Sequence, residues 1–279
     1  MAYRFIRSYR GPVKGVILDW SGTTADKYVL APAVVFVEVF KKYKVPISMP
    51  EARGPMGLRK DLHIKAITEN NDVRKRWHEV YGKYPVQGDV DNMFNDFVPM
   101  QLACLKKYTT LIPGTAETCK ILKNDFGVKI GSTTGFMRSM VDVLLEEGRK
   151  QGYHPDVTVA GDEVQNGARP KPHMVYRNMD LLDLNPIQSV VKVDDTITGV
   201  GEALEAGCWG VGVAKYSNYM GVDSLEEADA LTPEVEEERC KVSRDLLVKS
   251  GAHYVIDSIA ELPEVIEDVN RRLARGEKP

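Results

Sequence analysis

Hydrophobic positions divide the chain into two parts with different periods. An apolar run rich in β-branched residues, 13–18, predicts a buried strand that ends at Asp19. Between residues 27 and 108 the apolar positions recur at helical spacing, and no stretch there predicts a strand. The pattern therefore indicates a helical insertion directly after the first strand.

Local signals divide this insertion into helices. Pro32 opens the first helix, and Ser48 and Glu51 have the spacing of a capping box that opens the second. The run Gly54-Pro55-Met56-Gly57 should interrupt the second helix before it resumes. The expected spans after the interruption are 58–68, 72–81 and 89–107.

From about residue 111 onward, short apolar runs alternate with helical segments. The expected strands are 128–132, 157–160, 190–193, 210–213 and 254–256. The expected helices are 115–126, 138–151, 172–182, 201–206, 233–250 and a last one capped by Ser258 and Glu261. This alternation is typical of an α/β fold with a doubly wound, Rossmann-like parallel sheet. We expect a core domain of residues 1–26 and 109–279, and a helical cap domain of residues 27–108 over the strand tips.

Composition narrows the possible partners. A net charge of −3 gives no basic footprint, so we expect no nucleic-acid partner. No apolar run is long enough to span a membrane, and residues 1–12 lack the apolar core of a signal peptide. The four cysteines are widely spaced without a CxxC pair, which argues against structural zinc or a disulfide framework. A cytoplasmic location is expected.

The first strand carries the first chemical signal. Asp19 stands at its C-terminal end, the edge where open α/β sheets bind ligands. The small residues 21–24 follow, and the backbone around Ser21 and Gly22 can approach an anion closely. A turn containing Asp is common after a strand, so the weight of this signal depends on later segments.

Three later segments fit the same site. Thr133 and Thr134 offer hydroxyl and N–H groups suited to phosphate, and Arg169 offers a cation for a phosphoryl group. Asp194 and Asp195 offer oxygen ligands suited to Mg²⁺. Singly, such an Arg is more often a surface charge, and Asp-Asp-Thr is more often a helix cap. Together, each at a strand end, they indicate one site.

These segments resemble the haloacid dehalogenase superfamily over residues 13 to about 270. The resemblance implies that Asp19 attacks phosphorus and forms an aspartyl-phosphate. It also implies that Mg²⁺ bridges Asp19, the Ser21 carbonyl and Asp195. Some members have a further carboxylate where this chain has Gly199, and Asp194 is a candidate replacement, so the choice between Asp194 and Asp195 stays open.

Ser21 narrows the range of reactions that this site could catalyse. Phosphatases of the superfamily usually have a second Asp at this position, which protonates the leaving oxygen, and Ser21 cannot do so at neutral pH. Either the enzyme is poor or inactive, or its leaving group needs no protonated oxygen. A carbon leaving group meets the second condition if a lysine forms an imine with an aldehyde, because the protonated imine accepts the electrons of the breaking bond.

Lys60 is the candidate lysine, and His63 follows one helical turn later. Taken alone, Lys60 would be an exposed helix lysine. Its segment and the three core segments closely resemble the phosphonoacetaldehyde hydrolase (phosphonatase) family. That resemblance implies a Schiff base on Lys60, with Met56 and His63 matching the Met and His of the family's lid. Val29 and Phe136 stand where some members have Cys and Tyr, so proton-relay roles at those two positions cannot be carried over.

The expected activity is hydrolysis of phosphonoacetaldehyde to acetaldehyde and phosphate. The alternatives are a phosphate-ester hydrolase or phosphomutase, a dehalogenase, and a non-catalytic binding protein of the same fold. A homodimer is expected, and the aromatic stripe of Phe36, Phe40 and Tyr43 is expected in the core or in the dimer interface.

Overall fold

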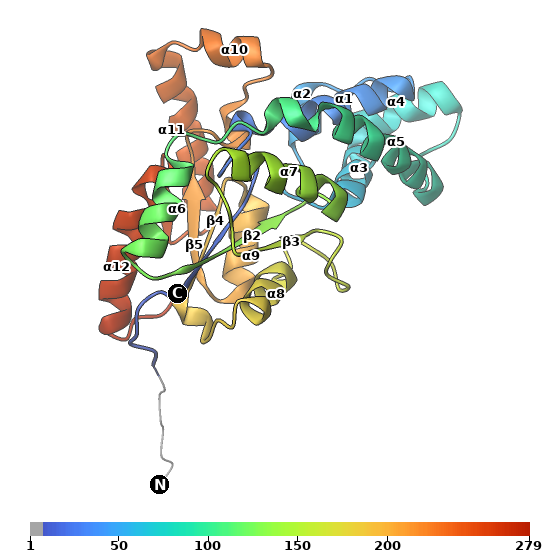
Figure 1. The fold of residues 1–279 in the computed structure, drawn as a ribbon. Helices are drawn as coiled ribbons and strands as arrows, with labels where there is room; N and C mark the ends of the chain where they lie inside the picture. The colour runs from blue at the N-terminus through green and yellow to red at the C-terminus, as the bar shows by residue number, and fades with distance from the viewer. Residues whose placement is uncertain (1–7) are drawn as a thin grey trace.

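The computed structural model describes residues 8–279, so most of segment 1–12, where no signal peptide is expected, lies outside it. The described part contains a six-stranded parallel sheet with the strand order β3-β2-β1-β4-β5-β6 (Figure 1). The strands are β1 Gly15–Leu18, β2 Lys129–Thr134, β3 Val157–Ala160, β4 Val190–Asp194, β5 Trp209–Val213 and β6 Tyr254–Ile256. The predicted doubly wound parallel sheet is confirmed.

The register of the sheet fixes the place of the site. β1 lies between β2 and β4, and Leu18 pairs with Ser132 on one side and with Val193 on the other. The residues that follow these three positions therefore meet at one edge of the sheet. From β1 the sheet grows through β2 and β3 on one side and through β4, β5 and β6 on the other, so the direction of strand addition switches at β1. Such a switch point opens a crevice for ligands in α/β folds.

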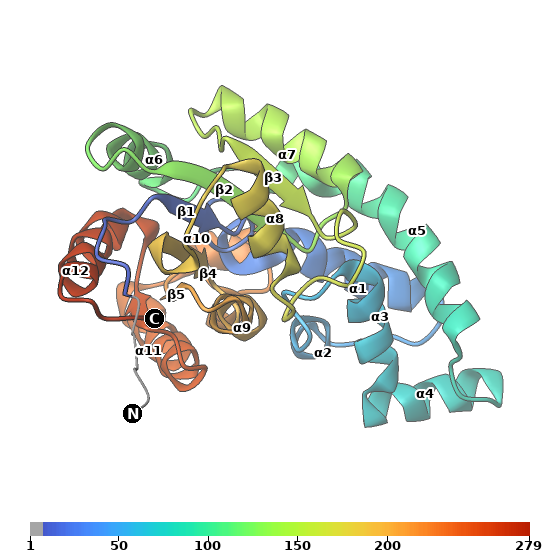
Figure 2. The same ribbon diagram turned by 90° about the horizontal axis from the view of Figure 1, so that it is seen from below.

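Helices cover both faces of the sheet. α6, α7 and α12 lie over one face, and α8, α9 and α11 lie over the other (Figure 2). Their bounds are α6 Thr115–Asn124, α7 Arg138–Lys150, α8 His173–Leu181, α9 Ile197–Ala206, α10 Leu225–Ala230, α11 Pro233–Lys249 and α12 Leu262–Ala274. The strands β1 and β5 are buried along their whole length, which explains their nearly continuous apolar sequence.

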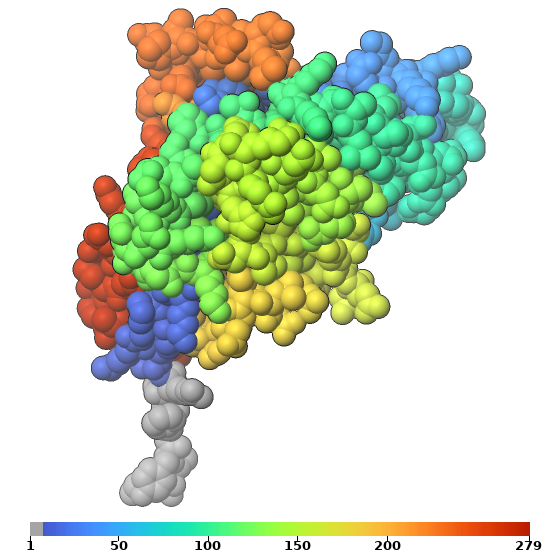
Figure 3. Space-filling view, in the orientation of Figure 1, coloured from blue at the N-terminus to red at the C-terminus, as the bar shows by residue number. Residues whose placement is uncertain are grey.

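The insertion after β1 is a helical cap. Its helices are α1 Leu30–Lys42, α2 Met49–Arg53, α3 Lys60–Glu69, α4 Asn71–Tyr81 and α5 Gln87–Leu105. They form a lobe beside the carboxyl ends of the strands (Figures 1 and 3). Phe36 and Phe40 are fully buried within this lobe, and Phe36 stacks on Phe97 at 4.6 Å. These two aromatic residues therefore belong to the core of the cap, and Tyr43 is half-buried against Asp96.

Several helix boundaries differ from the predicted ones. α3 begins at Lys60 instead of residue 58, because Gly57 has φ +95° and Arg59 is extended. α9 begins at Ile197 instead of Gly201, because the Thr196 hydroxyl accepts a bond from the Gly199 N–H at 3.0 Å and caps the helix. The pattern did not predict α10, a short helix capped by Ser224.

The structure bears on two expectations from composition, one about the cysteines and one about membrane spans. The four cysteines all lie in the described part and are free thiols. Among residues 8–279, no helix combines the length and the apolar character needed to cross a membrane.

Candidate active site

A small cavity lies where the cap meets the sheet edge. Core residues Asp19 and Arg169 line it from one side, and cap residues Met56 and Lys60 line it from the other. Ser21, Thr134 and Asp195 also contribute to its wall. The free space is about 20 Å³, enough for one or two waters, so the cap is closed over the site.

Asp19 occupies the end of β1 and is 5% exposed. Arg169 Nη2 donates to its Oδ1 at 2.5 Å. Burial raises the pKa of Asp19, and Arg169 opposes that shift. The loop behind it turns back at Gly22, which has φ +81°, and a Cβ there would stand 2.3 Å from the Asp195 carboxylate. Glycine at this position therefore leaves room for Asp195 beside Asp19.

Arg169 is held at the centre of the core side. Its guanidinium bonds Thr133 Oγ1 at 2.8 Å and Glu202 Oε2 at 3.0 Å, and it lies 3.2 Å from Asp194. Burial alone would lower the pKa of Arg169, but Asp19, Asp194 and Glu202 outweigh burial and raise it. Arg169 is therefore a fixed cation beside Asp19.

Asp194 and Asp195 differ in their partners. Asp194 accepts bonds from Lys192 Nζ at 2.7 Å and from the Thr196 hydroxyl at 2.7 Å. Asp195 accepts one bond from the Asn218 N–H at 2.8 Å, while its buried Oδ1 has no partner among residues 8–279. Burial tends to raise the pKa of both, but Arg169 and Lys192 lower that of Asp194, whereas that of Asp195 rises well above its usual value.

Gly199 accounts for the position of Asp194. A Cβ at Gly199 would stand 1.9 Å from the Asp194 carboxyl carbon. Asp194 therefore fills space that a larger residue at position 199 would need. This contact explains why a glycine at 199 accompanies an acidic residue at 194.

The acidic cluster fits a divalent cation. Carboxylate oxygens of Asp19, Asp194 and Asp195 lie within 4.8 Å of one another. Together with Glu202, four buried carboxylates face two buried cations, Arg169 and Lys192. The excess negative charge, the unpartnered Asp195 oxygen and the all-oxygen donor set match the preferences of Mg²⁺.

Lys60 is buried in the same cavity, with 4% of its surface exposed. Its Nζ lies 4.7 Å from the centre of the Phe136 ring and 5.8 Å from that of Phe36. Burial lowers the pKa of Lys60 to about 8, although Asp19 favours the charged form. The exposed position that Lys60 would have as an ordinary helix residue is not observed, and its amine faces the site.

His63 lies one turn further along α3 and is fully buried. Its ring stacks on Phe36 at 3.9 Å, and Nε2 lies 2.8 Å from the Ala52 carbonyl oxygen. That acceptor places the proton on Nε2, so Nδ1, which has no partner in the described part of the chain, is an open acceptor. Burial, then the charge of Lys60, lowers the pKa of His63 well below its usual value. His63 is therefore a neutral imidazole.

The cap loop fits tightly on the core. The Met56 carbonyl accepts a bond from the Thr198 hydroxyl at 2.9 Å. A Cβ on Gly57 would stand 1.9 Å from that same hydroxyl oxygen, and a Cβ on Gly135 would stand 2.6 Å from the Leu58 carbonyl oxygen. Two glycines, one in the cap and one in the core, thus permit the closed position.

Sequence reasoning missed several residues around the site. Lys192 and Glu202 hold Asp194 and Arg169, and both side chains are fully buried. A lysine in the middle of an apolar strand was a usable signal for Lys192. Glu202 and Arg53, a cap residue bonded to Asn218 of the core, had no local signal because their partners are distant in sequence.

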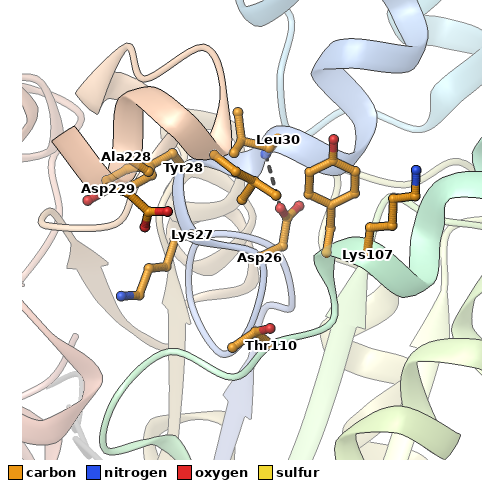
Figure 4. Close-up of a pocket in the computed structure, with 10 residues that line it drawn as sticks. Asp26, Lys27, Tyr28, Leu30, Lys107, Thr110, Ala228 and Asp229 are labelled. Carbon is orange, nitrogen blue, oxygen red and sulfur yellow. Dashed lines mark hydrogen bonds between the residues drawn. The ribbon is translucent and has the colours of Figure 1, made fainter. Parts of the chain in front are cut away.

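A second cavity, of about 230 Å³, lies between the two chain segments that join the cap to the core (Figure 4). Asp26 lies at its wall, with its carboxylate accepting a bond from the Leu30 N–H at 3.1 Å. Burial raises the pKa of Asp26 to about 7. Lys107 and Thr110 of the return segment lie opposite. This cavity shares no lining residue with the Asp19 cavity, and Leu225, Ala228 and Asp229 of α10 complete its wall.

Comparison with known proteins assigns the family. The family model described as haloacid dehalogenase-like hydrolase matches residues 16–213. The phosphonoacetaldehyde hydrolase of Syntrophobacter fumaroxidans is 39% identical over 99% of both chains, and that of Bacillus cytotoxicus is 41% identical over 93% of this chain and 97% of the other. The chain belongs to the phosphonoacetaldehyde hydrolase family of haloacid dehalogenase-like hydrolases.

Solved structures agree with this family. The phosphonoacetaldehyde hydrolase-like protein of Oleispira antarctica superposes with a TM-score of 0.95, at 37% identity over all of both chains. The β-phosphoglucomutase of Clostridium difficile has a TM-score of 0.68 at 16% identity and therefore shares the fold alone. The superposition on the Oleispira antarctica protein covers the whole chain and therefore includes residues 27–108.

Proposed function

We propose that this protein hydrolyses the C–P bond of phosphonoacetaldehyde, releasing acetaldehyde and phosphate. One observation carries the proposal: Lys60 of the cap and Asp19 of the core line the same small cavity. The names of the relatives support the same substrate. The proposal includes a core domain of residues 1–26 and 109–279 and a cap domain of residues 27–108.

In the proposed reaction the core holds the phosphonate group. Arg169 pairs with its charge, and Ser21, Thr133 and Thr134 supply hydroxyl donors. The N–H of Gly22, expected among these donors, already donates to the Ala25 carbonyl at 2.8 Å, so Gly22 contributes through its lack of a side chain. Mg²⁺ would be held by Asp19, Asp195 and the Ser21 carbonyl. Asp194 would orient these ligands. When bound, Mg²⁺ would neutralise charge on the phosphoryl oxygens.

Lys60 activates the carbon side. Its neutral amine adds to the aldehyde to form a carbinolamine. The carbinolamine loses water and gives an imine, which becomes protonated. We assign proton transfer at this stage to His63 Nδ1 acting with water, since that nitrogen is unprotonated and unpartnered. Met56, Phe136 and Val29 give the amine an apolar surrounding.

Asp19 then attacks phosphorus and the C–P bond breaks. The electron pair of that bond moves into the protonated imine, which becomes an enamine, so no leaving oxygen needs a proton. This explains why Ser21 can occupy the usual place of a second Asp. Water hydrolyses the aspartyl-phosphate, and protonation and hydrolysis of the enamine release acetaldehyde and free Lys60.

Reductive trapping tests this proposal. Borohydride added with phosphonoacetaldehyde should fix the substrate carbon on Lys60, as mapped by mass spectrometry of peptides. Lys60→Arg should abolish both trapping and turnover, because a guanidinium forms no imine under these conditions. Lys65→Arg is the matched control, since Lys65 is exposed on the same helix. Turnover that survives Lys60→Arg would contradict the Schiff base.

A phosphate-ester hydrolase or phosphomutase is the second candidate, favoured only by the Asp19–Arg169 pair, which suits any phosphoryl group. Steady turnover of sugar phosphates, with none of phosphonoacetaldehyde, would establish it. A cytoplasmic homodimer is also part of the proposal, and the four free thiols support a reducing location.

A further inference from the structure

Arg53 is a buried cation outside the Asp19 cavity. It ends α2 of the cap and is 6% exposed, with its guanidinium inserted into the core loop 218–223. Nη1 donates to the Tyr28 carbonyl at 2.7 Å and to Asn218 Oδ1 at 3.2 Å, and Nη2 donates to the Val222 carbonyl. Nε lies 3.3 Å from Asp223 Oδ1. This guanidinium therefore ties the cap to one core loop.

The bonding between Arg53 and Asn218 is reciprocal. Asn218 Nδ2 donates to the Arg53 carbonyl at 3.2 Å, so the two residues bond through both side chains and backbone. Such a pair can form only when the cap is closed on the core. Opening the cap would return a guanidinium and an amide to water and leave the core loop without this anchor.

The same loop holds Asp195. The Asn218 N–H donates to Asp195 Oδ2 at 2.8 Å, and the neighbouring Tyr219 hydroxyl accepts a bond from the Ile197 N–H at 2.9 Å. The Asn218 bond occupies one carboxylate oxygen and leaves Oδ1, buried and unpartnered, for a ligand. The orientation of Asp195 therefore depends on where loop 218–223 lies.

We propose that Arg53 is a positioning residue that couples closure of the cap to the orientation of Asp195. Cap docking places Arg53 on Asn218, and Asn218 fixes the carboxylate, so a closed cap binds the divalent cation more tightly. By linkage, the bound cation favours the closed cap to the same degree. This inference rests on the cation site of the proposed function.

Binding of Mn²⁺ to the full-length protein without substrate tests the coupling. Mn²⁺ accepts the same oxygen ligands as Mg²⁺ and can be followed by electron paramagnetic resonance. Arg53→Gln should raise the Mn²⁺ dissociation constant about tenfold, within the usual range of coupling between sites. Arg53→Lys, which keeps the charge without the fork of donors, should fall between Arg53→Gln and the parent.

Asn218→Ala tests the same coupling from the core side, so the test does not depend on the folding of Arg53 variants. It removes the side-chain bonds to Arg53 and keeps the N–H that faces Asp195, so the dissociation constant should rise similarly. The double variant should show less than the product of the two single effects. Independent, multiplicative effects would overturn the coupling.

Arg76→Gln is the matched control. Arg76 Nη2 donates to Glu51 Oε1 at 2.6 Å, a contact that holds α2 inside the cap. The Mn²⁺ affinity of this variant should stay within twofold of the parent, and a loss equal to that of Arg53→Gln would overturn the role of cap docking. Asp195→Asn distinguishes the cation site from the coupling. Unchanged Mn²⁺ binding in Asp195→Asn would refute the cation site. If Asp195→Asn loses Mn²⁺ binding while Arg53→Gln binds as the parent does, only the coupling is refuted.

Discussion

The two sides of the cavity treat charge in opposite ways. On the core side, which we call the floor (Asp19, Arg169, Asp194 and Asp195), nearly every charge has a partner at hydrogen-bond distance. The cap side, which we call the roof, consists of Met56 and Lys60, and the Lys60 amine faces aromatic rings. His63 is buried next to the roof and is not among the residues that line the cavity. The floor therefore pairs its charged groups with one another, whereas the roof leaves its amine without an ionic partner at hydrogen-bond distance among the described residues.

This difference matches two kinds of chemistry. A fixed set of ions suits a group that stays anionic, because preorganised charges need not rearrange during reaction. An apolar surrounding suits an amine nucleophile, because burial lowers its pKa and leaves more of it neutral. The difference implies that floor and roof can be disabled separately.

The largest difference between loss of floor chemistry and loss of roof chemistry is expected for Asp19→Asn. Without the nucleophile, release of phosphate should fall by about 10⁴-fold or more. Trapping of the substrate on Lys60 by borohydride should persist, because imine formation uses the roof. Peptide mapping together with a phosphate assay measures both events. Loss of trapping in Asp19→Asn would show that floor and roof do not act separately.

Removal of divalent cations should have the next largest effect. Chelation should lower phosphate release by about 10³-fold, as expected for the loss of several kcal/mol of charge stabilisation. Lysine trapping should change little, and added Mg²⁺ should restore turnover. Full turnover after exhaustive chelation would argue against a cation on the floor.

Gly57→Ala should obstruct the contact between the two sides. The new Cβ would meet the Thr198 hydroxyl at 1.9 Å, so the cap could not close fully and turnover should fall by about 10²-fold. Gly82→Ala is the matched control, because Gly82 also has a positive φ (+67°) but a Cβ added there would have no atom within 4 Å. Equal losses in both variants would attribute the effect to backbone strain.

The smallest effect is a pH dependence of the roof. The pKa of Lys60 is lowered to about 8, so the neutral amine is about a tenth of the total at pH 7 and increases as the pH rises. Initial trapping rates should rise about tenfold per unit below pH 8 and level off above it. Rates that continue to rise to pH 10 would mean that Lys60 is not desolvated.

The sequence alone predicted the alternation of strands and helices, and therefore the edge at which Asp19, Thr133, Arg169 and the Asp194–Asp195 pair would meet. Those predictions hold because strand periodicity is local and parallel strands end at the same edge. The placement of Lys60 toward that edge came from a resemblance of motifs. Helical periodicity alone would have left it exposed.

Tertiary structure decided the rest. Only the fold shows that Asp194 is satisfied by Lys192 while Asp195 keeps a free oxygen, although the two are adjacent in sequence. Only the fold shows that Arg53 reaches Asn218, 165 positions further along the chain. Burial and hydrogen-bond partners depend on segments brought together by packing, and local sequence patterns carry no information about such partners.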